Sequence, residues 1–201
     1  MKAGIDVYCE KPLSLTIEEG RLMADATKKH ERILQTGSQR RSSDKFRHVC
    51  ELVRNGRIGK LKHILVKITT RSGSADPWTP QAVPDYFHDD LWLGPAVRTP
   101  YHVDRRHYNF RFVSDYSGGD ITNMGAHFVD LAQWANGTSH TGPVEVHGHG
   151  KRNVQGPHDV FYDPHVEFTY DNGVTMTMEM TEQWQDYVRF EGTEGWIMAG
   201  R

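Results

Sequence analysis

The sequence predicts a short α/β part over residues 1–37, followed by an α+β domain over residues 38–201 with an open, mainly antiparallel sheet. Two observations predict this division. The first part contains a strand-like, a helix-like and a second strand-like segment in succession. Beyond residue 143, strand-like segments follow one another with short turns between them, which is typical of an antiparallel sheet with helices on one face.

The amino-terminal elements are predicted from local patterns. The two strands lie at residues 4–8 and 32–36, each a brief apolar run. The helix between them begins after Thr16, which fits a capping box with Glu19 because each side chain can bond the backbone N–H of the other residue.

The larger part begins with a helix over residues 44–55, which Gly56 ends by supplying a left-handed cap. Residues 61–70 alternate apolar and polar side chains and are predicted to form a strand. Residues 71–117 are predicted to be mostly irregular because they hold most of the chain's nine prolines. An irregular stretch of that length is usually functional or lies against a partner.

The remaining residues are predicted to form one helix, over residues 123–134, and then strands and turns. Asp171, Asn172 and Gly173 have the composition of a hairpin turn between two of these strands. The strands are predicted at residues 144–150, 164–170, 174–181, 188–192 and 196–199.

The composition argues against several classes of partner. A net charge of −2, from 24 basic and 26 acidic residues, gives no electrostatic reason to expect binding to nucleic acid or to an anionic membrane. No apolar run approaches the ~20 residues that a membrane-spanning helix needs. Two cysteines are too few for a disulfide scaffold. No metal site is predicted, because the twelve histidines lack a carboxylate or cysteine at a recognised ligand spacing.

Two short motifs indicate a single active site. The first, Glu-Lys-Pro at residues 10–12, presents a lysine on a turn fixed by proline. The second, residues 118–130, is a Gly-Gly turn leading into a helix that carries Asn123 and His127. Positions i and i+4 share a helix face, so both side chains can point at one ligand. A cation, an imidazole and an amide that converge on a pocket suit proton transfer to or from a hydroxyl or carbonyl.

These motifs resemble those of the Gfo/Idh/MocA oxidoreductase family, named after glucose-fructose oxidoreductase and inositol dehydrogenase. Residues 6–14 are similar to the family's Glu-Lys-Pro segment at the end of a Rossmann strand. Residues 118–130 are similar to its glycine-rich motif ending in His-x-x-Asp. Residues 92–95 and 108–111 are similar to a subgroup rich in sugar-processing members, and the resemblance covers essentially the whole chain.

The resemblance implies an NAD(P)-binding Rossmann domain, of which residues 1–37 would be the carboxy-terminal remnant, and a substrate and oligomerisation domain over residues 38–201. It implies hydride transfer between nicotinamide and a sugar, cyclitol or related polyol, with NAD or NADP as the cofactor. In the family the antiparallel sheet often forms the subunit interface, so a homo-oligomer through that sheet is expected.

The resemblance also implies roles for particular residues. Lys11 matches the family lysine that lies by the nicotinamide and the substrate hydroxyl, with Glu10 and Pro12 beside the cofactor. His127 matches the histidine that accepts or donates the proton. In the dehydrogenases an aspartate commonly stands four residues earlier, where this chain has Asn123. Asparagine can orient an imidazole or a hydroxyl but holds no negative charge, so His127 is expected to be a weaker base than in an Asp-His pair.

Further substrate-binding candidates lie near these motifs. Tyr108 and Arg111 offer the aromatic face and planar donor that suit a sugar, although packing of their loop on the sheet is an alternative. Asp130 could bond the substrate or cap a neighbouring group. Residues 39–41 follow a strand end, where ligands gather in α/β folds, but a solvated basic turn is the competing interpretation.

The three catalytic candidates have structural alternatives as well. Lys11 could be a solvated lysine before a turn proline, and His127 could be a core histidine. Asn123 could serve only as a helix cap after the Gly-Gly turn.

The family's phosphate-binding G-x-G-x-x-G occurs nowhere among the 201 residues, although its glycines permit close approach to the pyrophosphate. The chain is therefore expected to be a fragment of a longer enzyme, incomplete also at its carboxy end and inactive alone. The cytoplasm is the default compartment, and export stays open because the true amino terminus is expected upstream.

Two other functions stay open at this stage. Some relatives are glycosidases that use bound NAD to oxidise a glycoside transiently, eliminate the aglycone and re-reduce the product. The substituted aspartate and the aromatic loop are compatible with that chemistry. Alternatively, the sheet could persist as a non-catalytic oligomerisation or binding module.

Overall fold

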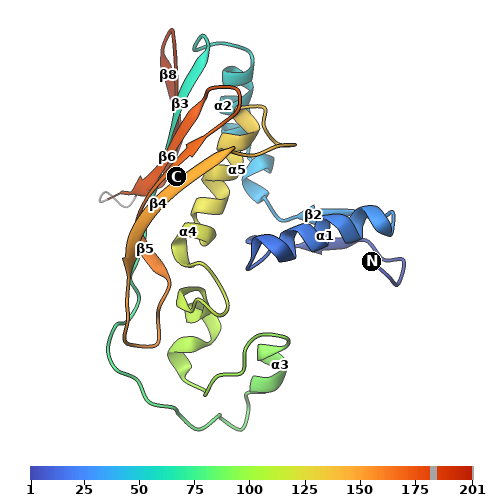
Figure 1. Cartoon of the computed structure of the whole chain (residues 1–201), viewed down its shortest axis with the longest axis vertical. Helices are drawn as coiled ribbons and strands as arrows, with labels where there is room; N and C mark the ends of the chain where they lie inside the picture. Colours follow the sequence, from blue (N-terminus) through green and yellow to red (C-terminus); the bar gives the residue numbers. More distant parts are fainter. Residues whose placement is uncertain (182–184, 201) are drawn as a thin grey trace.

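The computed structural model describes residues 1–181 and 185–200. Residues 1–37, called here the amino-terminal unit, project from the side of a larger domain built on a six-stranded sheet (Figure 1). Among the described residues, no helix is long and apolar enough to cross a membrane. The predicted fold class, a partial α/β unit followed by an α+β domain with a mainly antiparallel sheet, is confirmed.

The amino-terminal unit is a strand, a helix and a strand, as predicted. Strands β1 (Val7–Cys9) and β2 (Leu34–Thr36) pair in parallel, and α1 (Ile17–Lys29) connects them. The capping box is present: the backbone N–H of Glu19 donates to Thr16 Oγ1, and the Glu19 carboxylate accepts from the backbone N–H of Thr16, each at 3.2 Å. These local bonds fix the start of α1.

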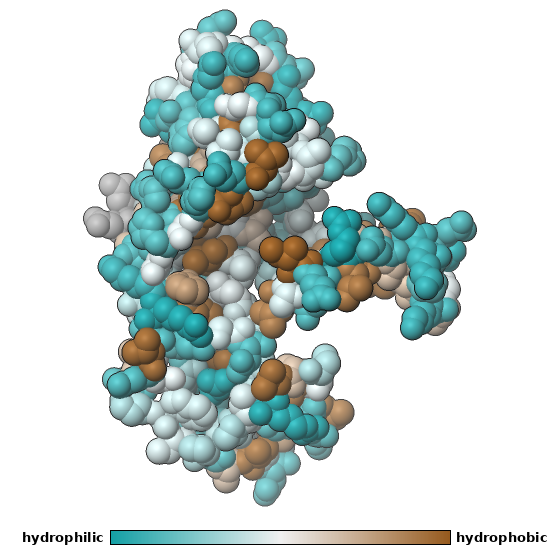
Figure 2. All heavy atoms as spheres, viewed as in Figure 1, coloured by the Kyte–Doolittle hydropathy of each residue, from teal (hydrophilic) through white to brown (hydrophobic). Residues whose placement is uncertain are grey.

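This unit buries little of its apolar surface. Helix α1 contains no buried residue, and its Ile17 and Leu22 side chains are 94% and 61% exposed. Apolar side chains are visible on the projecting unit in Figure 2. The unit therefore gains little hydrophobic stabilisation from the sheet domain.

The large sheet has the order β4-β5-β6-β3-β7-β8. Its central strand β3 runs parallel to β6 and antiparallel to β7, so the sheet is mixed at this one pairing of the described strands. The β5–β6 turn at residues 171–173 is the predicted hairpin. The strands are β3 (Leu61–Ile68), β4 (Glu145–Arg152), β5 (Phe161–Thr169), β6 (Thr175–Met180), β7 (Tyr187–Gly192) and β8 (Trp196–Gly200).

The core lies between one face of this sheet and the helices that cover it (Figure 1). Alternate residues of β3, Ile64, Val66 and Ile68, are fully buried on that face. Helices α2 (Asp44–Arg54) and α5 (Gly125–Ala135) supply the opposing side chains. Burial raises the pKa of the Cys50 thiol on α2 to about 11, so this cysteine behaves as a core residue.

The helix predicted over residues 123–134 is present as α5, but a separate short helix that the sequence did not predict comes before it. The structure has two helices, α4 (Gly119–Asn123) and α5, with Met124 between them. Gly119 begins α4 with a φ of +69°, and a Cβ atom there would lie 2.7 Å from the Val160 side chain. Asn123 is the last residue of α4, so its predicted alternative role as the cap of a following helix is wrong.

The long loop before α4 is mostly irregular, as predicted, with three short helical segments. Arg106 in this loop is fully buried and donates to Asp89 Oδ1 at 2.6 Å, with its guanidinium 4.8 Å from the centre of the Trp92 ring. A buried charge needs such partners to offset its desolvation. The three short helical segments of this loop are α3 (Asp89–Leu93), η2 (Val103–Arg105) and η3 (His107–Phe112).

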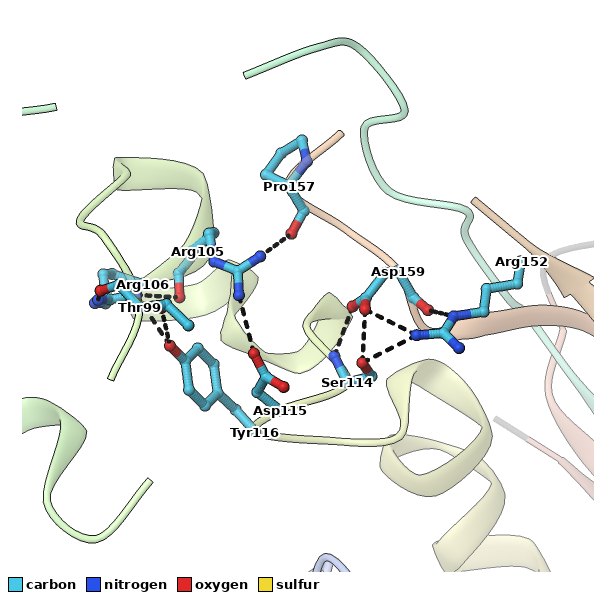
Figure 3. Close-up of polar contacts among 9 residues, drawn as sticks. All are labelled: Thr99, Arg105, Arg106, Ser114, Asp115, Tyr116, Arg152, Pro157 and Asp159. Carbon is cyan, nitrogen blue, oxygen red and sulfur yellow. Dashed lines mark hydrogen bonds and ion pairs between the residues drawn. The ribbon is translucent and has the colours of Figure 1, made fainter. Parts of the chain in front are cut away.

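A network of polar contacts ties this loop to the connection between β4 and β5 (Figure 3). Arg105 donates to the carbonyl of Pro157 and to Asp115, each at 3.2 Å. On the other side of the network, Ser114 donates its backbone N–H to Asp159 at 2.8 Å. The network holds both ends of η3, and η3 carries two of the predicted site residues.

Candidate active site

A cavity of about 410 Å³ lies between the amino-terminal unit and the sheet domain. Its volume falls within the ~300–1,000 Å³ range of small-molecule sites. The wall brings together residues from five separate stretches of sequence, three of which hold predicted site residues. The predicted residues in the wall are Lys11, Tyr108, Arg111, Asn123 and His127.

Lys11 is bound directly to the end of α4. Its Nζ donates to Asn123 Oδ1 at 2.7 Å and to the Asn123 carbonyl at 3.0 Å. In a continuous helix that carbonyl would accept the N–H of His127, but the break at Met124 redirects this N–H to the Met124 carbonyl at 3.1 Å. The break between the two helices thus makes an acceptor available to Lys11.

The surroundings of Lys11 disfavour its charged form. Burial lowers its pKa below the ordinary value, and the positive charge of Arg111 lowers it further. The charge of Glu10 acts in the opposite direction with a smaller effect. A lysine with a lowered pKa exchanges protons more readily near neutral pH than a solvated one.

His127 lies in the first turn of α5 and is 7% exposed. It lines the cavity with Asn123, although the two residues belong to different helices and not to one face of a single helix, as was predicted. The residue is therefore buried, as a core histidine is, and also forms part of the cavity wall.

Tyr108 and Arg111 come from η3 and stack on each other. The Arg111 guanidinium carbon lies 3.7 Å from the centre of the Tyr108 ring, and Arg111 Nε donates to the Tyr108 carbonyl at 2.9 Å. The hydroxyl of Tyr108 accepts from Arg71 at 3.3 Å. This hydrogen bond from Arg71 is the main cause that lowers the pKa of the Tyr108 hydroxyl.

Sequence reasoning missed an ion pair in the cavity wall. Arg71 binds the carboxylate of Asp120 with two side-chain nitrogens, at 2.9 and 3.0 Å, and with its backbone N–H at 3.1 Å. The Asp120 side chain is 1% exposed, and this pairing raises the pKa of Arg71. The two residues are 49 positions apart, so no local pattern could have linked them.

Three other wall residues, Thr69, Met124 and Asp186, were also missed. Asp186 is 4% exposed and accepts the backbone N–H of Thr69 at 2.6 Å. The pairing of β3 with β7 in the folded sheet brings Asp186 to the end of β3. Because this pairing joins residues far apart in the chain, the sequence around Asp186 carries no motif that predicts it.

Some predicted residues do not line this cavity. Glu10 is exposed, and its carboxylate lies so close to Gly37 that a Cβ there would be 2.8 Å away. Pro12 follows a cis peptide bond and lines a neighbouring cavity with Gly118 and Thr122.

Asp130 lies in another cavity, where it binds Arg41 through two bonds of 2.7 and 2.8 Å. This pairing raises the pKa of Arg41. The neighbouring Arg40 places its guanidinium 4.2 Å from the centre of the Phe128 ring. Residues 40 and 41 are thus packed against α5 rather than forming a solvated turn. Within the described residues, no group of three or more His, Cys, Asp or Glu side chains could hold a metal ion.

Family comparisons agree with this architecture. Residues 44–200 match the oxidoreductase family model for the C-terminal alpha/beta domain, and residues 1–38 match the model for its NAD-binding Rossmann fold. The chain belongs to the Gfo/Idh/MocA oxidoreductase family. The predicted family membership and its nicotinamide cofactor class are thereby confirmed, whereas the choice between NAD and NADP stays a prediction.

Two curated relatives are similar in sequence. Myo-inositol 2-dehydrogenase of Thermotoga maritima is 45% identical over 76 residues, which are 38% of this chain and 22% of that protein. Uncharacterized oxidoreductase YrbE of Bacillus subtilis is 29% identical over 196 residues, which are 94% of this chain and 46% of that protein. The chain thus spans less than half the length of either relative.

Solved structures share the fold. The WlbA dehydrogenase of Chromobacterium violaceum, in complex with NADH and UDP-GlcNAcA, has a TM-score of 0.69 and 18% identity over 100% of this chain and 50% of that one. Myo-inositol 2-dehydrogenase of Lactobacillus plantarum has a TM-score of 0.64 and 24% identity over 98% of this chain and 51% of that one.

Proposed function

We propose that this chain, within a polypeptide that carries a complete dinucleotide-binding domain, belongs to an NAD(P)-dependent oxidoreductase that acts on a sugar, cyclitol or related polyol. The observation that carries the proposal is the meeting of Lys11 with Asn123 and His127 in one cavity. The names of its myo-inositol dehydrogenase relatives support the substrate class.

The residues present fit the nicotinamide end of such a cofactor. Lys11 lies two residues after the last residue of β1, beyond the carboxyl end of a parallel strand, where ligands bind in α/β sheets. Glu10 and Pro12 flank it on the same turn. The glycine cradle for the pyrophosphate is not among these 201 residues, so the proposal assigns it to the rest of the polypeptide. When bound, NAD(P) supplies the group that accepts or delivers the hydride.

The chain's own residues handle the proton. When the substrate carbon gives up hydride, the hydroxyl on that carbon must lose its proton, and Lys11 Nζ and His127 are the two titratable groups we assign to accept this proton. The lowered pKa of Lys11 increases its neutral, proton-accepting fraction. Asn123 holds Nζ in place through its amide oxygen and leaves its NH₂ group to orient a substrate oxygen.

Replacement of Lys11 tests this proposal. In the complete gene product, we expect Lys11→Ala to lower kcat for polyol-dependent NAD(P) reduction by at least about 10²-fold, the usual contribution of a positioned acid or base. The matched control is Lys29→Ala, an exposed lysine in the last turn of α1. Full turnover by the Lys11 variant would contradict the proposal. A folded protein without nucleotide affinity would instead favour a non-catalytic binding module.

One residue favours a second candidate function, transient oxidation followed by elimination in an NAD-dependent glycosidase. Asn123 stands where the family's dehydrogenases commonly carry an aspartate, and its amide brings no negative charge to that position. The same preparations distinguish the two functions. Release of an aglycone from a glycoside without accumulation of NADH identifies the glycosidase, and accumulation of NADH identifies the dehydrogenase.

We further propose that the chain forms a homo-oligomer through the sheet face opposite the helices. That face is open in Figure 1 and carries large side chains, including Trp196 and Met198, which are 59% and 48% exposed. The Arg189 guanidinium lies 4.7 Å from the centre of the Trp196 ring. Light scattering on the complete gene product tests this proposal. A Trp196→Glu variant whose assembly in solution has a lower mass than that of the parent supports the interface, and a parent protein that is monomeric contradicts it.

A further inference from the structure

Arg111 has two terminal nitrogens without a hydrogen-bond partner among the residues that the structure describes. Its Nε is engaged by the Tyr108 carbonyl at 2.9 Å, and the Tyr108 ring supports the plane of the guanidinium at 3.7 Å. The side chain lines the same cavity as Lys11 and His127. Arg111 is therefore held in orientation, with its remaining donors unused.

Arg71 provides a comparison within the same cavity. It contacts the same tyrosine, but Asp120 occupies its guanidinium through two bonds of 2.9 and 3.0 Å. The charge of Arg71 is thus neutralised inside the protein. Arg111 forms no ion pair with any carboxylate in the part of the chain that the structure describes.

One arginine of the wall has no carboxylate partner among the described residues. The wall carries two arginines, Arg71 and Arg111, and two carboxylates. One carboxylate, Asp120, pairs with Arg71, and the other, Asp186, accepts the Thr69 N–H. Burial lowers the pKa of Lys11 most, and the positive charge of Arg111 lowers it further.

We propose that the substrate is a sugar acid whose carboxylate is bound by the two terminal nitrogens of Arg111. This inference rests on the proposed function, since it names the substrate class of that same cavity. A planar guanidinium matches a carboxylate through two parallel hydrogen bonds, and such charge-assisted pairs are roughly twice as strong as neutral ones.

A competition between matched sugars tests this inference in the complete gene product. We expect kcat/KM for D-glucuronate to exceed that for D-glucose, and we expect Arg111→Gln to lower this ratio by at least about tenfold. Arg57→Gln is the matched control because Arg57 is exposed and outside the cavity, so it should leave the ratio unchanged. Arg111→Lys keeps the charge but not the planar pair of donors, and we expect an intermediate ratio.

Several outcomes would overturn the inference without touching the proposed function. One is oxidation of D-glucose at a kcat/KM equal to or above that of D-glucuronate. Another is an Arg111→Gln variant whose ratio is the same as that of the parent. A preference for D-glucose 6-phosphate over D-glucuronate would assign the cavity to a phosphate instead.

Calorimetry separates this inference from the proposed function. If no sugar is oxidised, the proposed function fails. Titration of the complete gene product with D-glucuronate and with D-glucose still measures which of the two sugars binds more tightly. Tighter binding of D-glucuronate that Arg111→Gln abolishes, with an unchanged circular dichroism spectrum, supports the carboxylate site. Equal binding of the two sugars overturns it.

Discussion

The amino-terminal unit and the sheet domain differ in how much apolar surface each of them buries. In the sheet domain, side chains such as Phe128 and Ile64 are fully buried between helix and sheet. In the amino-terminal unit, α1 buries no residue. Hydrophobic burial is the main favourable term in folding, so the sheet domain supplies most of the stability of this chain. The amino-terminal unit instead supplies Lys11 to the cavity, through polar bonds to Asn123.

The largest change in stability is expected from truncating a core side chain of the sheet domain. Phe128→Ala should lower the free energy of unfolding by about 3–5 kcal/mol, because it leaves a cavity under the sheet. Leu22→Ala on α1 is the matched truncation in the other unit, and it should change that free energy by less than ~0.5 kcal/mol because Leu22 is 61% exposed. Denaturant titration measures both free energies of unfolding, and equal losses would show that Leu22 contributes as much to stability as the buried Phe128.

A smaller effect is expected from a buried carboxylate. Asp120→Asn should cost about 2 kcal/mol of unfolding free energy, because it removes the partner of Arg71, whose own side chain is 40% exposed and partly solvated. Asp25→Asn is the control in the amino-terminal unit, where the carboxylate is 59% exposed and 3.8 Å from Arg21. That variant should leave the unfolding midpoint unchanged. A stability for Asp120→Asn equal to that of the parent would show that the Arg71 pair contributes nothing.

Arg111→Gln should raise the Lys11 pKa, because it removes a positive neighbour that disfavours the charged amine. Nuclear magnetic resonance of the isotope-labelled lysine side chains measures this, and the titration curve of the exposed Lys29 should be the same in parent and variant. A Lys11 pKa that stays constant or falls in the variant would contradict the electrostatic account of the cavity.

The same shift fixes the sign of a pH dependence. Because the Lys11 pKa is lowered in the folded chain, the unfolded chain binds more protons as pH rises through that pKa toward the ordinary value of 10.5. The contribution of Lys11 to folding stability is therefore unfavourable at lower pH and is relieved as pH rises across this window. Arg111→Gln should narrow this pH range, because it raises the pKa of folded Lys11 toward the ordinary value of 10.5.

The sequence was informative where a few neighbouring residues decide the structure. The Thr16–Glu19 capping box and the turn at residues 171–173 are local bonds and were predicted in place. The meeting of Lys11 with Asn123 spans 112 positions, and it was predicted because both lie in short motifs whose chemistry is complementary.

The errors arise where distant residues decide. The parallel pairing of β3 with β6, the Arg71–Asp120 pair and the Arg41–Asp130 pair each join positions far apart in sequence. None leaves a periodic or local signal. The short helix α4 was not predicted, because the break at Met124 that separates it from α5 leaves no local sequence signal. The carbonyl that this break exposes accepts from the amine of Lys11, 112 positions away.

We propose that Lys11 of the amino-terminal unit and Asn123 of the sheet domain act together in proton transfer, through the bond between Lys11 Nζ and Asn123 Oδ1. A double-mutant cycle on kcat/KM in the complete gene product tests it most directly, with Lys11→Ala, Asn123→Ala and the double variant. If the 2.7 Å bond positions Lys11 for proton transfer, the loss of kcat/KM in the double variant should be smaller than the product of the two single losses, and what it loses beyond Lys11→Ala is the contact of the Asn123 amide with the substrate. Losses that multiply in the double variant would contradict the account, because they would show that the two residues act independently.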